Sequence, residues 1–299
     1  MQAQRILLFL SPLLLALTAT AGRINGDYRN SELIEASLPV NDTDVTVTVF
    51  NVYGPIDVQG HDGDEITVTA RNEVWADTAE LVATGLAEVD VKVVRHGAQV
   101  YVFLDTPYTH FDPVAGELWH SDTCWRRDDC TIKHQRKAYA YRMAIEVQVP
   151  QAMSLDVSAI NDGDITIQDM HGQRLQVNNI NGAIDLSQVS GQTLVNAINQ
   201  DIHIEYSENP AADSSFESIN GDVVITFAGE PNAELVYQTM HGDLYSRFDV
   251  SALSPKVTRT SQQKEHGIQY QLDAENRLLV GAGGPEYRFK TLNGDIKIK

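Results

Sequence analysis

Residues 219–225 read Ile-Asn-Gly-Asp-Val-Val-Ile, and residues 292–298 read Leu-Asn-Gly-Asp-Ile-Lys-Ile. Both stretches place an aliphatic residue before Asn-Gly-Asp and alternate apolar and polar residues after it. Looser copies begin at residues 160, 180, 198 and 240. A turn-then-strand unit at near-regular spacing is typical of a stacked array. The first five turn positions are 19, 18, 21 and 21 residues apart, and the sixth follows after 52: Gly163, Gly182, Gln200, Gly221, Gly242 and Gly294.

Each repeat unit combines turn residues with a short strand. Asn-Gly favours a tight turn because both residues tolerate positive φ, and the alternation after it has the period of a half-buried strand. Second turns at residues 170–172 and 189–191 divide many units into about two strands and two turns. Such a unit buries its apolar face only by stacking on its neighbours. Stacking in register predicts a side-chain ladder at the turn: Asn161, Asn181, Asn199, Asn220 and Asn293.

Two all-β architectures compete for residues 151–247. An antiparallel sandwich also has short strands with frequent turns, but it does not require the same phrase at the same corner each time. The repeat therefore favours a parallel β-solenoid. In that fold five aliphatic residues take equivalent inward positions in successive rungs: Ile165, Ile184, Ile202, Val223 and Leu244.

The Asn-Gly-Asp phrases resemble those of the bacterial putative-adhesin family of β-strand repeat domains. The resemblance extends to residues 51–58, which look like a degenerate first rung, and to residues 63–70, which look like the strand that follows. It implies an all-β fold, a single-stranded β-helix-like solenoid, in an exported envelope or extracellular protein. It supplies no catalytic residues, and residues 106–140 have no counterpart in the family pattern.

The first 21 residues predict a cleaved signal peptide. Arg5 precedes an apolar stretch at residues 6–17, and residues 19–21 read Ala-Thr-Ala, a small-residue cleavage site. A transmembrane helix needs about 20 apolar residues, so an uncleaved anchor is the less favoured alternative. No cysteine follows for lipid attachment. We expect a periplasmic or secreted protein without stable membrane insertion.

The remaining chain divides into a β-rich region at residues 22–150 and the repeat region at residues 151–299. Asp77-Thr78-Ala79-Glu80 forms a capping box that opens a short helix to about Glu88. We expect this helix to cover the N-terminal end of the solenoid, because a bare end exposes unpaired backbone. Residues 89–95 and 99–104 predict a hairpin, and residues 141–149 a further strand.

The insertion at residues 106–140 departs from the repeat. Cys124 and Cys130 predict a disulfide that closes a small loop, because exported proteins meet an oxidising compartment. Trp119 and Trp125 are candidates for a partner contact, although they could equally pack on the flank of the array. A metal site is the less favoured alternative, with five candidate ligands: His110, His120, Cys124, Cys130 and His134.

The chain is strongly acidic, with 22 basic and 41 acidic residues and a net charge of −19. Loss of residues 1–21 removes Arg5 and no acidic residue, so the net charge becomes −20. Such a surface repels phosphate backbones and anionic lipid, which makes nucleic acid an unfavourable partner. It favours cations or a basic partner, or it simply keeps a β-rich protein soluble.

Aspartates recur after the repeat glycine or its substitute, and in-register stacking would space them roughly 4.8 Å apart. Such a stripe could bind calcium or serve a sugar-cleaving site. Aspartate also favours turns by accepting backbone hydrogen bonds, which explains the pattern without a ligand. No hydrolase elbow, zinc-protease motif or phosphate loop is present. The recurring residues are Asp164, Asp201, Asp222, Asp243 and Asp295.

The sequence therefore predicts a non-enzymatic exported protein without cofactor or metal. It acts as an envelope scaffold or as an adhesion or interaction module with a protein or glycan partner. The alternative is a glycan-active β-helix enzyme that uses turn carboxylates.

The chain ends one residue after Ile298, so we expect the last repeat to form an end rung. Lys297 and Lys299 would protect its edge, or residues 248–290 would fold back as a cap. Either device predicts a mainly monomeric protein.

Overall fold

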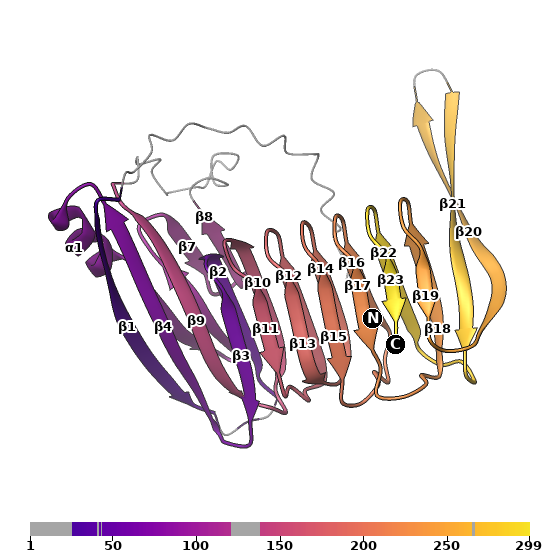
Figure 1. Ribbon diagram of the computed structural model, residues 1–299, viewed down its shortest axis with the longest axis horizontal. Coiled ribbons are helices and arrows are strands. Elements are labelled where there is room, and N and C mark those ends of the chain that lie inside the picture. Colours follow the sequence, from indigo (N-terminus) through magenta and orange to yellow (C-terminus); the bar gives the residue numbers. More distant parts are fainter. Residues whose placement is uncertain (1–25, 41, 43, 121–137, 265–266) are drawn as a thin grey trace.

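The computed structural model describes the chain except residues 1–25, 41, 43, 121–137 and 265–266. Two large sheets face each other in an elongated stack (Figure 1). The strands of sheet A, in spatial order, are β1 (Tyr28–Pro39), β4 (Glu65–Ala76), β9 (Ala140–Pro150), β3 (Ile56–His61), β11 (Ile165–Gln168), β13 (Ile184–Val189), β15 (Ile202–Tyr206), β17 (Val223–Thr226), β23 (Ile296–Ile298) and β19 (Leu244–Ser246).

Sheet B lies behind sheet A, and a small hairpin and one helix, α1 (Ala79–Glu88), complete the described structure. The hairpin consists of β7 (Thr109–Asp112) and β8 (Glu117–His120). The strands of sheet B, in spatial order, are β20 (Val250–Lys264), β21 (Gly267–Val280), β18 (Ala233–Thr239), β22 (Glu286–Thr291), β16 (Ser214–Ser218), β14 (Gln192–Ala197), β12 (Arg174–Asn179), β10 (Ser154–Asn161), β2 (Thr46–Tyr53), β6 (Gln99–Asp105) and β5 (Asp90–His96).

Each rung gives one strand to sheet B and, after a tight turn, one strand to sheet A. From β10 to β17 the chain makes four such rungs in succession, and every pairing between them is parallel. The parallel solenoid is therefore confirmed for residues 154–226, and the antiparallel sandwich is wrong there. The ends of the stack differ, because antiparallel strands extend both sheets: β1 and β4 in sheet A, and β5, β20 and β21 in sheet B.

The core lies between the two sheets, where every second side chain points inward. Ile165, Ile184, Ile202 and Val223 pair in register and are fully buried, as predicted. Burial of an aliphatic side chain of this size stabilises the fold by roughly 1.5–3 kcal/mol. Leu244 was expected beside Val223, but the last repeat separates them, and Leu244 pairs with Ile296 instead.

The spatial order of the rungs departs from chain order at both ends. The last rung, β22 and β23, lies between the rung of β16 and β17 and the rung of β18 and β19. The predicted uncovered C-terminal rung is therefore wrong, because β23 has a parallel neighbour on each side. At the other end, β2 and β3 lie between β6 and β9 on one side and β10 and β11 on the other. Both sheets contain strands from either side of the expected boundary between residues 150 and 151, because β2 pairs with β10 and β3 pairs with both β9 and β11.

The predicted helix is present and packs against β1 and β4 at the N-terminal end of the stack (Figure 1). Thr78 caps it, with its hydroxyl accepting a hydrogen bond from the backbone N–H of Leu81 at 3.3 Å. Val82 and Gly85 are buried, and a Cβ added at Gly85 would lie 2.6 Å from Val74. The helix thus closes one end of the core. Across the described part of the chain, no helix is long and apolar enough to cross a bilayer.

Candidate binding face

The repeat turns carry an asparagine ladder along one edge of the stack. The amide of each asparagine donates to the amide oxygen of the one before it in the stack, at 2.8, 2.7, 3.1 and 2.8 Å. Each internal member thus has a donor and an acceptor within the ladder, so the ladder joins neighbouring rungs. Its members are Asn161, Asn181, Asn199, Asn220 and Asn293.

Glycine recurs at the repeat turns for a reason other than turn conformation. None of the repeat glycines from Gly163 onward has a positive φ, and neither do the ladder asparagines. A Cβ at Gly182 would lie 2.0 Å from the carbonyl oxygen of Gly163, and a Cβ at Gly294 would lie 2.1 Å from that of Gly221. At these positions glycine allows a close approach of neighbouring rungs that a Cβ would obstruct. Gln200 takes the equivalent place in its own rung, so the requirement is not the same in every rung. The turns at these positions therefore form without the positive φ that Asn and Gly tolerate.

The recurring aspartates are bound to the backbone of the adjacent rung. Asp222 accepts from the backbone N–H of Asp295 at 2.9 Å, and Asp295 accepts from that of Asp243 at 3.0 Å. Asp201 and Asp164 accept in the same way from Asp222 and Ala183. This supports the turn role over a ligand-binding stripe. Among the described residues, no three His, Cys, Asp or Glu side chains are grouped so that they could hold a metal ion.

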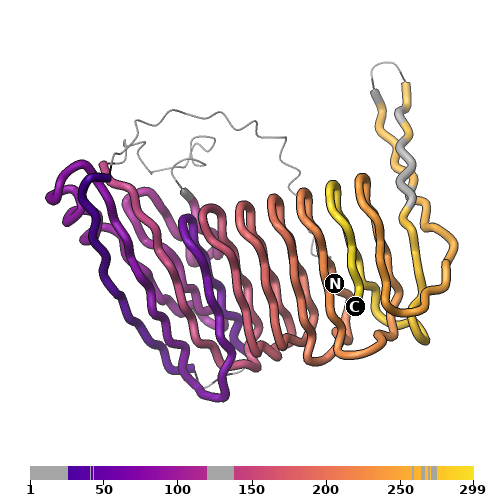
Figure 2. Tube along the Cα trace, viewed as in Figure 1, coloured from indigo at the N-terminus to yellow at the C-terminus, as the bar shows by residue number. Residues whose placement is uncertain are grey.

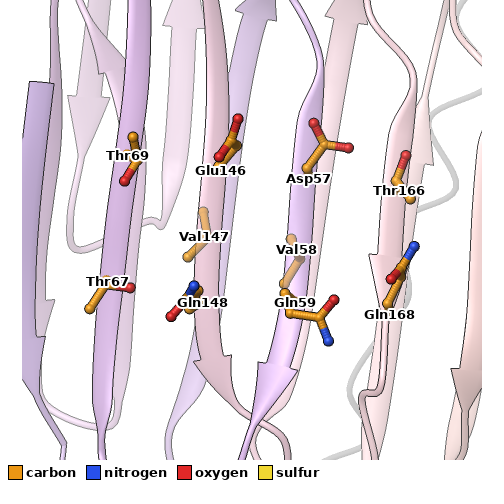
Figure 3. Close-up of a pocket in the computed structure, with 10 residues that line it drawn as sticks. All are labelled: Asp57, Val58, Gln59, Thr67, Thr69, Glu146, Val147, Gln148, Thr166 and Gln168. Carbon is orange, nitrogen blue, oxygen red and sulfur yellow. The ribbon is translucent and has the colours of Figure 1, made fainter. Parts of the chain in front are cut away.

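The outer face of sheet A carries hydrogen-bonding side chains in two rows, because alternate residues of each strand point away from the core. Figure 3 shows four members of each row side by side across β4, β9, β3 and β11, with Val58 and Val147 between the rows. The first row contains Thr69, Glu146, Asp57 and Thr166, and the second contains Thr67, Gln148, Gln59 and Gln168. Together they line an open groove of about 320 Å³.

The groove combines two rows of polar side chains with the apolar surface of Val58 and Val147 between them. Asp57 and Glu146 stand opposite each other on β3 and β9, and both side chains are exposed. Hydroxyl and amide groups surround them, and none of the groove's lining residues is aromatic. Gln59 donates to Asp169 at 2.8 Å, which orients one of its amides. The groove therefore offers both donors and acceptors to a ligand, with the two carboxylates at the centre of its first row.

The same face continues toward the C-terminal end of the stack. His203 Nδ1 lies 3.3 Å from Asp185 Oδ1, beside a second depression of about 270 Å³. Lys297 donates to Asp222 at 2.5 Å, and this bond lowers the pKa of the Asp222 carboxyl and raises the pKa of the Lys297 ammonium. A third hollow, of about 450 Å³, is lined by one acidic and three basic side chains beside Tyr245: Asp295, Arg247, Lys297 and Lys299. The charge of the face thus changes from acidic to basic along the stack.

The described part of the insertion lies on the other side of the molecule. Its hairpin lies against sheet B, where Phe111 stacks on Phe103 at 4.2 Å and contacts Tyr101 at 4.8 Å. Trp119 is half-buried on β8. Trp125, Cys124 and Cys130 lie outside the described residues, as does the predicted signal peptide. The disulfide, its metal alternative and the tryptophan contact stay predictions.

Sequence reasoning missed the two rows of the outer face. The alternation after each turn assigns every second residue, such as Thr166 and Asp185, to the outside, but these residues were not aligned across rungs as one surface. The signal was present in the alternation of strands such as residues 184–187 and 202–205. The contribution of β9 and β4 could not be found in this way, because their pairing depends on the tertiary fold.

The family model described as Toastrack DUF4097 matches residues 143–299. Among curated proteins, none matches the chain. A solved structure of a putative cell adhesion protein from Clostridium sporogenes ATCC 15579 is similar, with 8% identity, a TM-score of 0.41, and coverage of 90% of this chain and 99% of that one.

Two further solved structures are similar. A putative adhesin (BF0245) from Bacteroides fragilis NCTC 9343 has 11% identity and a TM-score of 0.30, and the match covers 90% of this chain and 97% of that one. A putative adhesin from Parabacteroides merdae ATCC 43184 has 10% identity and a TM-score of 0.29, with coverage of 89% and 95%.

Proposed function

We propose that this chain, which belongs to the Toastrack DUF4097 family, is a non-enzymatic adhesion-type interaction module of the bacterial envelope. Its binding surface is the outer face of sheet A, and its ligand is an extended glycan that is neutral or carries amino groups. Export rests on the apolar leader at residues 1–21, which directs the mature protein to the periplasm or beyond.

The observation that carries this proposal is the pair of polar rows on sheet A. Strand pairing places hydroxyl, amide and carboxylate groups at intervals of about 4.8 Å across the sheet. A flat array of donors and acceptors suits an extended polymer rich in hydroxyl groups. The net charge of −19 opposes the binding of polyanions, which leaves neutral and cationic glycans.

One observation favours a second function. Asp57 and Glu146 are paired carboxylates on adjacent strands, and glycoside hydrolysis uses two carboxylates. A catalytic acid, however, is usually held in an apolar pocket that keeps it protonated near neutral pH. Both side chains here are exposed in an open polar groove. Binding without cleavage is therefore the better supported role.

The experiment measures depletion of the protein from solution by insoluble cellulose, chitosan and calcium alginate, which are neutral, cationic and anionic glycans. We expect binding to cellulose or chitosan and none to alginate. Gln148→Ala with Gln168→Ala removes two amides from the groove and should weaken binding about ten-fold, since a hydrogen bond contributes about 0.5–1.5 kcal/mol.

The matched control is Asn196→Ala with Gln238→Ala, which removes two exposed amides from sheet B. This control should bind as the unaltered protein does. Equal loss in both variants, or no binding to any of the three glycans, would exclude the groove as the site. Release of reducing sugar that disappears in Asp57→Asn would show the enzyme instead.

A further inference from the structure

The hairpin of β20 and β21 is only partly joined to the stack. Residues 276–280 of β21 pair with β18, whereas residues 267–275 pair with residues 256–264 of β20 and with no other described strand. We name this outer part, residues 256–264 and 267–275, the distal arm. Figures 1 and 2 show it projecting beyond the turns of the neighbouring rungs. Residues 248–290 were expected to cap the last rung, but the base of the hairpin pairs with β18 and extends sheet B there, while the last rung lies inside the stack.

The distal arm has one apolar face. Register places Val257, Arg259 and Ser261 on the same face as Ile268 and Tyr270. On this face Val257, Ile268 and Tyr270 are 62%, 54% and 53% exposed, and the Arg259 guanidinium lies 4.2 Å from the centre of the Tyr270 ring.

The opposite face is polar and includes Lys256, Thr260 and Gln262. A two-stranded hairpin with one uncovered apolar face is marginally stable by itself in water. We therefore expect the apolar face to contact another surface.

The base of the hairpin is well anchored, so the arm leaves the stack in a defined direction. Arg277 forms a bidentate ion pair with Glu234 of β18, with Nη2 to Oε2 at 2.7 Å. Arg288 of β22 pairs with Glu275 at the start of the arm. Planar, bidentate guanidinium–carboxylate contacts restrict geometry more than single ion pairs do.

Charge identifies the occupant of the apolar face. The distal arm together with the two residues at its tip, residues 256–275, contains three basic and three acidic residues and is therefore neutral in a chain whose net charge is −19. In two copies of this chain, the negative charges on the two stacks repel each other, whereas the two neutral arms do not. The arm also has unpaired backbone along β20, which is an end strand of sheet B. We propose that the distal arms of two copies pack apolar face against apolar face around a two-fold axis and form a dimer.

The size of the arm sets the strength of this contact. Nine paired residues span about 30 Å, and two strands are about 10 Å wide, so each arm offers on the order of 300 Å². Two arms together would bury on the order of 600 Å², which is below the roughly 1,200 Å² of stable specific interfaces, so we expect a weak, transient contact with a Kd on the order of 100 µM. The protein is therefore monomeric in dilute solution and dimeric where it is concentrated. The monomer expected from the sequence describes the dilute state.

Sedimentation velocity of the chain from residue 22 onward, from about 1 to about 300 µM, tests this proposal across the expected Kd. We expect a concentration-dependent shift from monomer to dimer. Added salt should strengthen the dimer, because it screens the repulsion between acidic bodies. Val257→Asp with Ile268→Asp should weaken association at least ten-fold, since it places charges in the apolar contact.

The control is Thr260→Asp with Gln262→Asp, which adds the same charge to the polar face. This control should dimerise like the unaltered protein, and both variants should keep its circular dichroism, because all four positions are exposed. A protein that stays monomeric at the highest concentration, or a control that loses association equally, would overturn the proposal. Association that weakens with salt would indicate an ionic contact between arm and body and would overturn it too.

Discussion

Replacing Gly221 by alanine tests whether the close approach of neighbouring rungs explains the recurring glycine. A Cβ at this position would lie 2.1 Å from the carbonyl oxygen of Gln200 and 2.4 Å from its carbonyl carbon. Ordinary contact begins at 3.4 Å, so the two rungs must separate locally by about 1 Å. Both contacting atoms belong to the backbone, and no side-chain rotation can relieve the overlap.

The magnitude follows from the hydrogen bonds that hold these rungs together. Separation weakens the bond from Ile202 N–H to the Asp222 carbonyl at 2.9 Å and that from Asp222 N–H to Asp201 at 2.8 Å. Each contributes about 1 kcal/mol, and overpacking adds about 1–3 kcal/mol. We expect Gly221→Ala to reduce the free energy of unfolding by about 3–5 kcal/mol and the Tm by about 10 °C.

Urea and thermal denaturation followed by circular dichroism measure this loss. Gly229→Ala is the matched control, because a Cβ there meets nothing within 4 Å and its φ is not positive. The control should change stability by less than about 1 kcal/mol, with a gain expected from the stiffer unfolded chain. If Gly221→Ala matched the unaltered protein, or if both variants lost the same amount, close rung approach would not explain the glycine.

Three further predictions concern the core, the ladder and the outer face of sheet B. Ile202→Asp should unfold the array because its site is fully buried, whereas the uncharged change Thr166→Asn at an outward position should cost about 0.5 kcal/mol or less; loss of the β-sheet circular dichroism in both would contradict the inward and outward assignment. Asn199→Ala removes hydrogen bonds to two ladder neighbours and should lower the urea midpoint by the equivalent of about 1–2 kcal/mol; an unchanged midpoint would show that the ladder adds no stability. Burial raises the pKa of Asp156 to about 6, so the folded protein holds this proton more tightly than the unfolded chain and loses stability as pH rises from about 4 through 6. Asp156→Asn should therefore raise the free energy of unfolding by about 1–3 kcal/mol at pH 8 and leave it unchanged at pH 4, and equal effects at both pH values would argue against this titration.

The rung was predictable because its signals are local. Alternation after the turn assigns Ile184 and Ile202 to the core and Asp185 and His203 to the outside without knowledge of the fold. The helix at residues 79–88 and the hairpin across Gly97 were predictable for the same reason, since capping and turn residues act within a few positions.

The candidate binding face was only half predictable. Outward positions of β11, β13 and β15 follow from the repeat, but Glu146 and Thr69 join them through β9 and β4, which lie beyond the repeat. The antiparallel pairing of β4 to β9 spans about 70 residues in the chain, and no local pattern encodes it. The chemistry of the groove therefore belongs to the tertiary structure.

By itself the sequence determined the unit: its period, its turn residues and its buried side. The tertiary structure decided the order of the units, because strands of equal length and alternation can pair with any similar neighbour. Packing between specific side chains selects among these pairings, as where Phe216 stacks on Phe289 at 5.1 Å and Phe227 on Tyr287 at 5.4 Å to hold the last rung inside the stack. Because the last rung lies between β16 and β18, the hairpin of β20 and β21 forms the end of sheet B, and its arm projects from the stack.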